Sequence, residues 1–71
     1  SDIRLLYETS DWETALIILQ RYDIRYIFVG SLEMRTYAVS EEKFSQNLQA
    51  GFSEGDVRIY IVPELLLNDV R

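Results

Sequence analysis

The 71-residue chain contains neither cysteine nor histidine, and their absence removes most of the familiar catalytic and metal chemistry. Without a thiol there is no disulfide and no thiolate ligand, and without an imidazole the commonest zinc ligand and general base is missing. The usual nucleophilic triads and zinc hydrolase sites cannot be assembled from the residues that remain. We therefore expect no enzyme activity, no cofactor and no metal site in this chain.

Basic side chains and long apolar runs are scarce as well. Seven Lys and Arg against twelve Asp and Glu give a net charge of −5, and phosphate binding needs clustered basic residues, so we expect no nucleic-acid partner. The longest apolar run, residues 15–19, is far short of the roughly 20 residues that cross a bilayer, so we expect no direct membrane insertion. Because the chain opens at Ser1 and not at Met, we expect a domain cut from a longer protein.

The residues that are present have the composition of a folded domain. Hydrophobic residues make up 48% of the chain and charged residues 27%, which is ordinary for a globular protein and excludes a low-complexity chain. A chain this short buries only roughly 60% of the surface that its unfolded form exposes, so its stability should be modest. We expect residues 1–71 to form one small domain.

The first half of the chain shows a pattern of strand, helix and strand. Residues 3–7 are strand-like, and Ser10 with Glu13 fits a capping box at the start of a helix. That helix has an apolar stripe at helical spacing, formed by Trp12, Ala15, Leu16, Leu19 and Tyr22. Residues 24–29 are β-prone and apolar on both faces, which is typical of a central strand. Short connections between these elements predict a parallel βαβ unit.

The second half predicts a short helix and a hairpin. Ser40 should cap the helix, which buries Phe44 and Leu48. Residues 51–56 have the glycines of a tight turn and should join a short strand near residue 52 to a strand at 57–62. Residues 64–71 should form a loose or partly helical tail. The predicted fold is a two-layer α/β (α+β) domain with a mixed four-stranded sheet, a parallel βαβ unit, a C-terminal hairpin and two helices mainly on one face.

The segment after the predicted central strand is the candidate contact loop. Residues 32–37 show no clean period, and loops at the carboxyl end of a strand often hold ligands in α/β folds. The candidate residues are Ser31, Glu33, Arg35 and Tyr37, whose carboxylate, guanidinium and phenol could together bind a polar group. Alternatively, Glu33 pairs with Arg35 or caps backbone amides while Tyr37 packs over the sheet edge. Carboxylate-based hydrolysis at Glu33 is the remaining enzymatic hypothesis.

Two stretches of the sequence resemble a known family. Residues 22–33 together with Tyr37 are similar to a pattern Y-x-V-x-Y-V-x-V-G-x-L-E-R-x-x-Y in the C-terminal soluble segment of the YYY family, many-span membrane proteins similar to lipid-linked-sugar-dependent glycosyltransferases. Lys43 and Phe44, followed by residues 51–62, are similar to the closing hairpin of these segments. The resemblance covers residues 5 to 62. Ser31 stands where the pattern has Pro and Met34 where it has Arg, which leaves any charge-dependent role to Arg35.

The resemblance implies a setting and not a reaction. Catalytic carboxylates would lie in loops of the membrane part, and this chain would be a non-catalytic accessory domain on the extracytoplasmic face, acting in packing or acceptor contact. Its partner would be the transmembrane part of its own parent chain. The alternative is a cytoplasmic, soluble protein-interaction or regulatory binding module. It would bind another chain through residues 31–37 or through a free sheet edge. A weak homodimer through a sheet edge is a further expectation.

Overall fold

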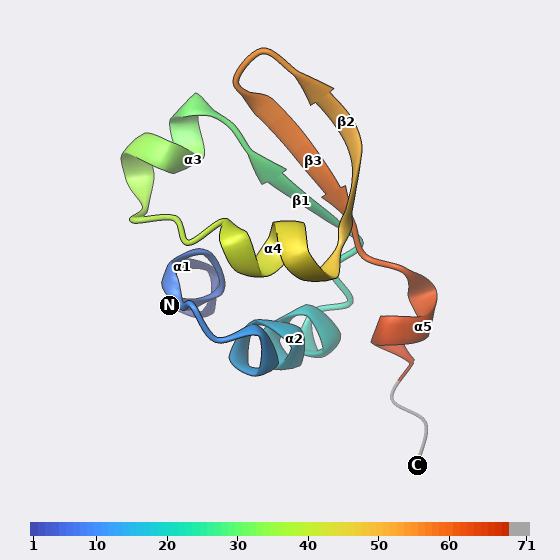
Figure 1. Ribbon diagram of the computed structural model, residues 1–71. Helices are drawn as coiled ribbons and strands as arrows, with labels where there is room; N and C mark the ends of the chain where they lie inside the picture. Colours follow the sequence, from blue (N-terminus) through green and yellow to red (C-terminus); the bar gives the residue numbers. More distant parts are fainter. Residues whose placement is uncertain (69–71) are drawn as a thin grey trace.

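The computed structural model describes residues 1–68, which form five short helices and three strands (Figure 1). The three strands make one antiparallel sheet in the order β1-β3-β2. In chain order the elements are α1 (Asp2–Glu8), α2 (Trp12–Arg21), β1 (Tyr26–Val29), α3 (Ser31–Thr36), α4 (Glu42–Asn47), β2 (Gln49–Glu54), β3 (Val57–Ile61) and α5 (Glu64–Leu67).

The sheet corrects the predicted fold class. We expected four strands with a parallel βαβ unit, but within residues 1–68 the sheet has three strands and every pairing is antiparallel. The hairpin strand β3 is the central one, whereas β1, which we expected at the centre, lies at an edge. Tyr26 pairs with Ile61 and Phe28 with Ile59, so β1 runs antiparallel to a strand some 30 residues later. The chain reaches that pairing through α3 and α4, so no βαβ crossover is formed.

The predicted first strand, residues 3–7, is helix α1. Ser1 caps it, since its hydroxyl oxygen accepts a hydrogen bond from the Arg4 amide at 3.2 Å. Arg4 and Glu8 form an i,i+4 ion pair at 2.9 Å on its exposed side. Leu6 is buried against α2, and a short apolar run is compatible with either a strand or one turn of an amphipathic helix. In the structure these residues are a helix, and its buried side chain, Leu6, packs against α2.

The two predicted helices are present, with their starts moved by one or two residues. Asp11, not Ser10, caps α2, and its carboxylate accepts from the Thr14 amide at 3.0 Å. The apolar stripe of α2 is confirmed for Ala15 and Leu19, which are buried. The cap position of α4 is Glu41 and not Ser40, while Phe44 in α4 and the following Leu48 are buried as predicted.

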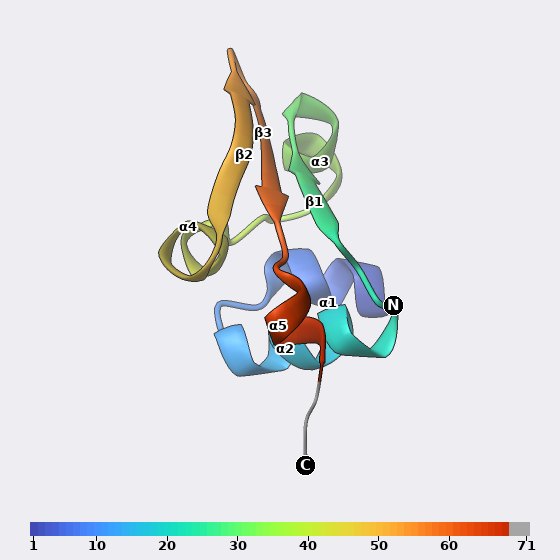
Figure 2. The ribbon, with the colours of Figure 1, turned by 90° about the vertical axis from the view of Figure 1, so that its right-hand side faces the viewer.

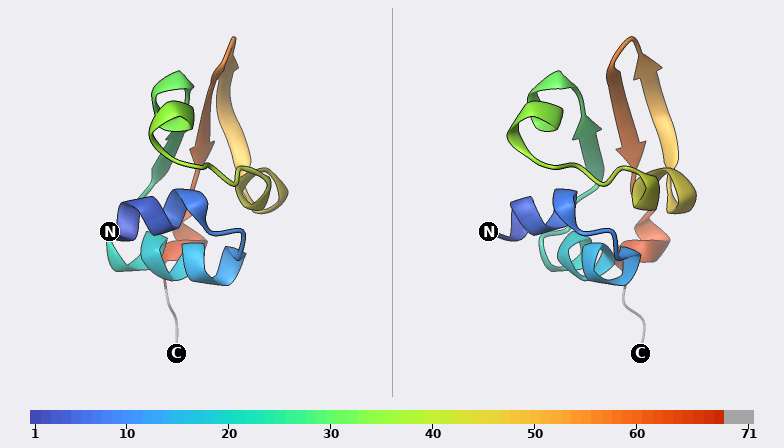
Figure 3. Two further views of the ribbon diagram at one scale, coloured as in Figure 1. Left: turned by 90° about the vertical axis from the view of Figure 1, so that its left-hand side faces the viewer. Right: turned by 60° about the vertical axis from the view of Figure 1, so that its left-hand side comes forward.

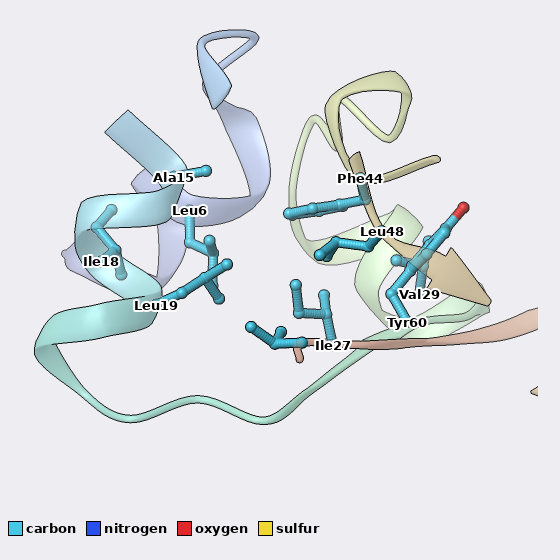
Figure 4. Packing of buried hydrophobic residues seen from close by; sticks show 10 residues of the cluster. Leu6, Ala15, Ile18, Leu19, Ile27, Val29, Phe44, Leu48 and Tyr60 are labelled. Atoms are coloured by element: carbon cyan, nitrogen blue, oxygen red, sulfur yellow. The ribbon is translucent and has the colours of Figure 1, made fainter. Parts of the chain in front are cut away.

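The helices pack against one end and one face of the sheet. Helices α1, α2 and α5 lie below the end of the sheet, α4 lies against its lower part, and α3 lies beside β1 (Figures 1 and 2). The buried residues of β1 alternate with exposed ones, so Ile27 and Val29 face the helices. Figure 4 shows Ile27 next to Leu19 from α2 and Val29 beside the Tyr60 ring, with Leu48 and Phe44 near them in the same cluster. This contact between one sheet face and two helices is the core.

The C-terminal hairpin is confirmed. β2 and β3 pair directly, and the turn between them contains Gly55 at φ +60, a left-handed conformation that favours glycine. Both views in Figure 3 show this turn at the end of the molecule farthest from α1 and α2. Pro63 follows β3, and the predicted tail is helical over Glu64–Leu67. The rest of that tail, residues 69–71, lies outside the described residues.

Candidate functional site

The predicted contact loop is a helix. Residues 31–36 form α3, and the Gly30 amide donates a hydrogen bond to Glu33 Oε1 at 2.9 Å. A carboxylate three residues after the cap position satisfies a free amide at the helix start, which is the carboxylate half of a capping box. The spacing between Gly30 and Glu33 was the sequence signal for this helix. Glu33 therefore has a backbone-capping role, the alternative to ligand contact that the sequence left open.

Tyr37 lies in an aromatic stack against α1. Its ring is 4.9 Å from that of Tyr7 with an interplanar angle of 10°, and the Arg4 guanidinium is 5.3 Å from the Tyr37 ring centre. The Tyr7 hydroxyl donates to the Phe28 carbonyl at 2.7 Å, which ties α1 to the edge strand β1. Burial, followed by the nearby Glu33 and Tyr37, raises the pKa of Tyr7 to about 12.

Ser31 and Arg35 do lie together, on a shallow cavity of about 320 Å³ between α3 and the hairpin. Its lining residues are Ser31, Met34, Arg35, Asp56 and Arg58. Arg35 is exposed and has no ion pair within residues 1–68. The cavity therefore combines one unpaired guanidinium with a carboxylate and a second, paired guanidinium. Arg58 and Asp56 come from the hairpin, more than 20 residues away in sequence, so their meeting with α3 could not be predicted from local spacing.

Arg58 is held by a half-buried cluster with Glu41 and Tyr60. Glu41 accepts from Arg58 Nε, from Arg58 Nη2 at 2.9 Å and from the Tyr60 hydroxyl at 2.6 Å. The hydrogen bond from Arg58 lowers the pKa of Glu41 below its usual value, while burial and then the hydrogen bond to Glu41 raise the pKa of Tyr60 to about 12. These contacts join the start of α4 to the central strand β3. The cluster therefore has a structural role in holding these two elements together.

Lys43 is the one buried charged side chain within the described part of the chain. Its ammonium donates to the Tyr7 carbonyl at 3.0 Å and to the Ser40 carbonyl at 2.6 Å, and lies 4.1 Å from the centre of the Phe44 ring. Burial lowers the pKa of Lys43 to about 8. The Tyr7 carbonyl belongs to α1 and the Ser40 carbonyl lies just before α4, so Lys43 ties α4 to α1.

Within residues 1–68, the face of the sheet that points away from the helices is apolar and has no cover. Antiparallel partners lie on the same side of a sheet, and the pairs Tyr26 with Ile61, Phe28 with Ile59 and Phe52 with Ile59 all lie on this side. Tyr26 is 61% exposed, Phe28 53% and Phe52 45%. We call this surface the open sheet face, and its six members are Tyr26, Phe28, Phe52, Val57, Ile59 and Ile61. These exposures, together with the edge position of β1, correct the expectation that residues 24–29 form a central strand.

A groove of about 370 Å³ runs over the open sheet face. Tyr26 and Phe28 of β1 line one side, Phe52 of β2 lines the other, and Ile59 and Ile61 of β3 lie between them. Gly51 is the extra residue of a bulge in β2, and a Cβ there would lie 2.2 Å from Ile61 Cδ1, so the side chain of Ile61 occupies the space that glycine leaves. The aromatic side chains thus rise on two sides of an aliphatic floor.

The described residues assemble no group of three metal-ligating side chains. None of the helices in residues 1–68 is long and apolar enough to span a membrane. Comparison of the chain with protein-family models, with curated proteins and with solved structures finds no match in any of the three. The open sheet face and the cavity beside Arg35 are therefore the two surfaces from which a function can be argued.

Proposed function

We propose that this chain is a non-catalytic accessory domain on the extracytoplasmic face of a longer membrane protein that resembles a glycosyltransferase. It acts by packing its open sheet face against the rest of its own parent chain. The exposed apolar sheet face is the observation that carries the proposal. The resemblance of residues 22–33 and 51–62 to the YYY family supplies the setting.

The size of the open sheet face favours a tethered partner. An aromatic side chain has about 150–250 Å² to bury, so the three half-exposed rings of Tyr26, Phe28 and Phe52 leave roughly 300 Å² in contact with water. Covering that area is worth about 7 kcal/mol at ~25 cal/mol per Å². Free association of two molecules costs about 4–15 kcal/mol in lost translational and rotational freedom. A covalent linker removes most of that cost, so a face of this size suits a partner in the same chain.

A protein-interaction module is the second candidate, and the free edge of β2 favours it. All six residues of β2 are exposed, and the described residues place no strand beside its outer edge. Such an edge can pair with an added strand from another molecule, including a second copy of this chain. The bulge between Ala50 and Phe52 weakens such pairing because it interrupts the regular hydrogen-bond ladder. The charge of Glu54 on the edge strand also disfavours it. The packing role of the open sheet face is therefore preferred.

The first test is the reading frame of the parent gene. Several apolar spans of about 20 residues in that frame are expected, and their absence would remove the membrane setting and leave the interaction module.

The second test is Phe28→Asp in the full-length protein, with Ile17→Asp on α2 as the matched control, because the two side chains are 53% and 54% exposed. Neither change should alter the melting temperature of the isolated domain by more than a few degrees, since both sites are at the surface. In the full-length protein Phe28→Asp should release the domain and make the junction to it sensitive to limited proteolysis. An unchanged cleavage rate for Phe28→Asp, or an equal rise for Ile17→Asp, would contradict the proposal.

A further inference from the structure

The polarity of the open sheet face restricts what can lie on it. Its six side chains carry one polar atom, the Tyr26 hydroxyl, and the polar side chains on the same side, Gln49 and Glu54, lie at the two ends of β2. The strands beneath them hydrogen-bond to one another. A segment lying flat on this face must therefore satisfy its own backbone N–H and C=O groups. An α-helix does so internally, whereas an extended peptide does not. The occupant is thus a helix or another complete sheet.

A second copy of this chain is a poor occupant. Stable interfaces bury about 800 Å² on each partner, and the three exposed rings supply roughly 300 Å², with the partly exposed Val57, Ile59 and Ile61 adding less than that. Each copy also carries a net charge of −5, so two copies repel one another. Sheet-on-sheet dimerisation is therefore disfavoured by area and by charge, which leaves the helix.

The width of the groove matches a helix. Neighbouring strands lie about 4.8 Å apart, so β1 and β2 are roughly 10 Å apart across β3, close to the ~10–12 Å diameter of a helix with its side chains. Tyr26 and Phe28 on one side and Phe52 on the other would contact the flanks of such a helix. Its apolar ridge would rest on Ile59 and on Ile61, whose side chain fills the space beside Gly51 and forms part of the floor.

The charge at one end of the face indicates which charge a bound segment should carry there. Glu54 pairs with Val57 in the sheet and so lies on the same side as the open sheet face. It is exposed and makes no ion pair or side-chain hydrogen bond within residues 1–68. Gln49, which pairs with Ile61 and lies on the same side at the opposite end of β2, is uncharged. A basic side chain is therefore favoured at the hairpin end of the groove.

From these observations we infer that the groove of the open sheet face holds an amphipathic α-helix of the parent chain, with a Lys or Arg of that helix beside Glu54. The inference rests on the proposed function and adds the chemistry of the partner. Helix-in-groove contacts of this kind use apolar side chains at positions i, i+3 or i+4, and i+7. The parent chain should contain such a pattern with a basic residue at one end of it.

The test replaces Phe28 by the photo-cross-linking residue p-benzoylphenylalanine in the full-length protein, in its native membrane. Mass spectrometry then locates the cross-link. The control places the same residue at Tyr22, which is also 53% exposed but directly follows α2 and does not line the groove. A cross-link from position 28 to a segment of the same chain with the helical apolar spacing and a terminal Lys or Arg is expected, and none from position 22.

Charge variants test the contact with Glu54. Glu54→Lys should lower the yield of the cross-link about two- to fivefold, the range expected for one exposed ion pair, and the loss should be smaller at high salt. Asp56→Asn, which lies in the turn and not on the face, should leave the yield unchanged. Cross-links to a second copy, to lipid, to a separate protein or to a non-helical segment, or an unchanged yield in Glu54→Lys, would overturn the inference.

The two proposals fail in different ways. If Phe28→Asp releases the domain but the cross-link falls in a segment without helical spacing, the accessory role stands and the helix is wrong. If Phe28→Asp has no effect in the full-length protein and position 28 gives no cross-link, the accessory role itself is contradicted.

Discussion

The stability of the domain should increase between pH 8 and pH 10 because of Lys43. Its pKa is lowered to about 8 in the fold, whereas an unfolded lysine titrates near 10.5. Between these values the unfolded chain holds a proton on Lys43 that the folded chain has released. The free energy of unfolding rises with pH wherever the unfolded state binds more protons, so the fold gains stability across this window.

The size of the increase follows from the shift. One pKa unit is worth about 1.4 kcal/mol, so a shift from 10.5 to about 8 sets an upper limit near 3 kcal/mol. The two carbonyl acceptors and the Phe44 ring stabilise the ammonium and oppose the effect of burial, so we expect a rise of about 1–3 kcal/mol. Above pH 10 the trend should reverse, because Tyr7 and Tyr60 keep their protons in the fold up to about pH 12 and lose them near 10 when unfolded.

Urea denaturation followed by Trp12 fluorescence between pH 7 and pH 11.5 measures this profile. The control is Lys43→Met, which keeps the length of the side chain and removes the titrating group. In the native chain the Tyr7 carbonyl also accepts the Ser40 amide at 2.8 Å, so it should keep a donor in that variant. The native chain should reach its greatest stability near pH 10, and the variant should lack the rise from pH 8. A flat profile in the native chain, or the same rise in Lys43→Met, would refute the role assigned to this lysine.

Three further changes test the fold. Leu19→Ala empties a site that is 0% exposed and should lower the free energy of unfolding by about 2–5 kcal/mol in urea denaturation. Glu41→Gln should cost about 1–3 kcal/mol at pH 7. Because the pKa of Glu41 is lowered in the fold, the native chain loses this advantage progressively as pH falls below about 4.5, and the difference between the two melting temperatures should shrink. Gly55→Ala forces a side chain into φ +60 and should cost about 1 kcal/mol, with Gly55→Asn milder, whereas equal stability of all three chains would contradict the turn conformation.

Local signals in the sequence predicted the elements whose structure is set locally. The glycines and polar residues around Gly55 predicted the hairpin, and the helical spacing of Ala15 and Leu19 predicted the buried face of α2. The first seven residues show the limit of this approach. Leu5, Leu6 and Tyr7 suit a strand as well as a helix turn. The Ser1 cap and the Arg4 to Glu8 spacing are the sequence signals for a helix that the prediction missed.

The arrangement of the sheet and of its surfaces depends on contacts between distant residues. Placing β3 in the centre requires Tyr26 to meet Ile61, and no local spacing encodes a pairing over that distance. The same holds for the ion pair of Arg58 with Glu41, 17 residues apart. The exposure of Tyr26 and Phe28 was missed because a run that is apolar on both faces reads as a buried strand, although one of its faces has no cover within residues 1–68. A surface that binds a partner has the composition of a core.

The central claim, that the open sheet face is covered in the longer protein, is tested most directly by hydroxyl-radical footprinting. Oxidation of Tyr26, Phe28 and Phe52 is compared between the isolated chain and the full-length protein, with Tyr22 as the internal reference because it has a similar exposure on another surface. The account predicts that the three face residues are protected severalfold in the full-length protein while Tyr22 is oxidised equally in both. Equal oxidation of the face residues in the two proteins would contradict it.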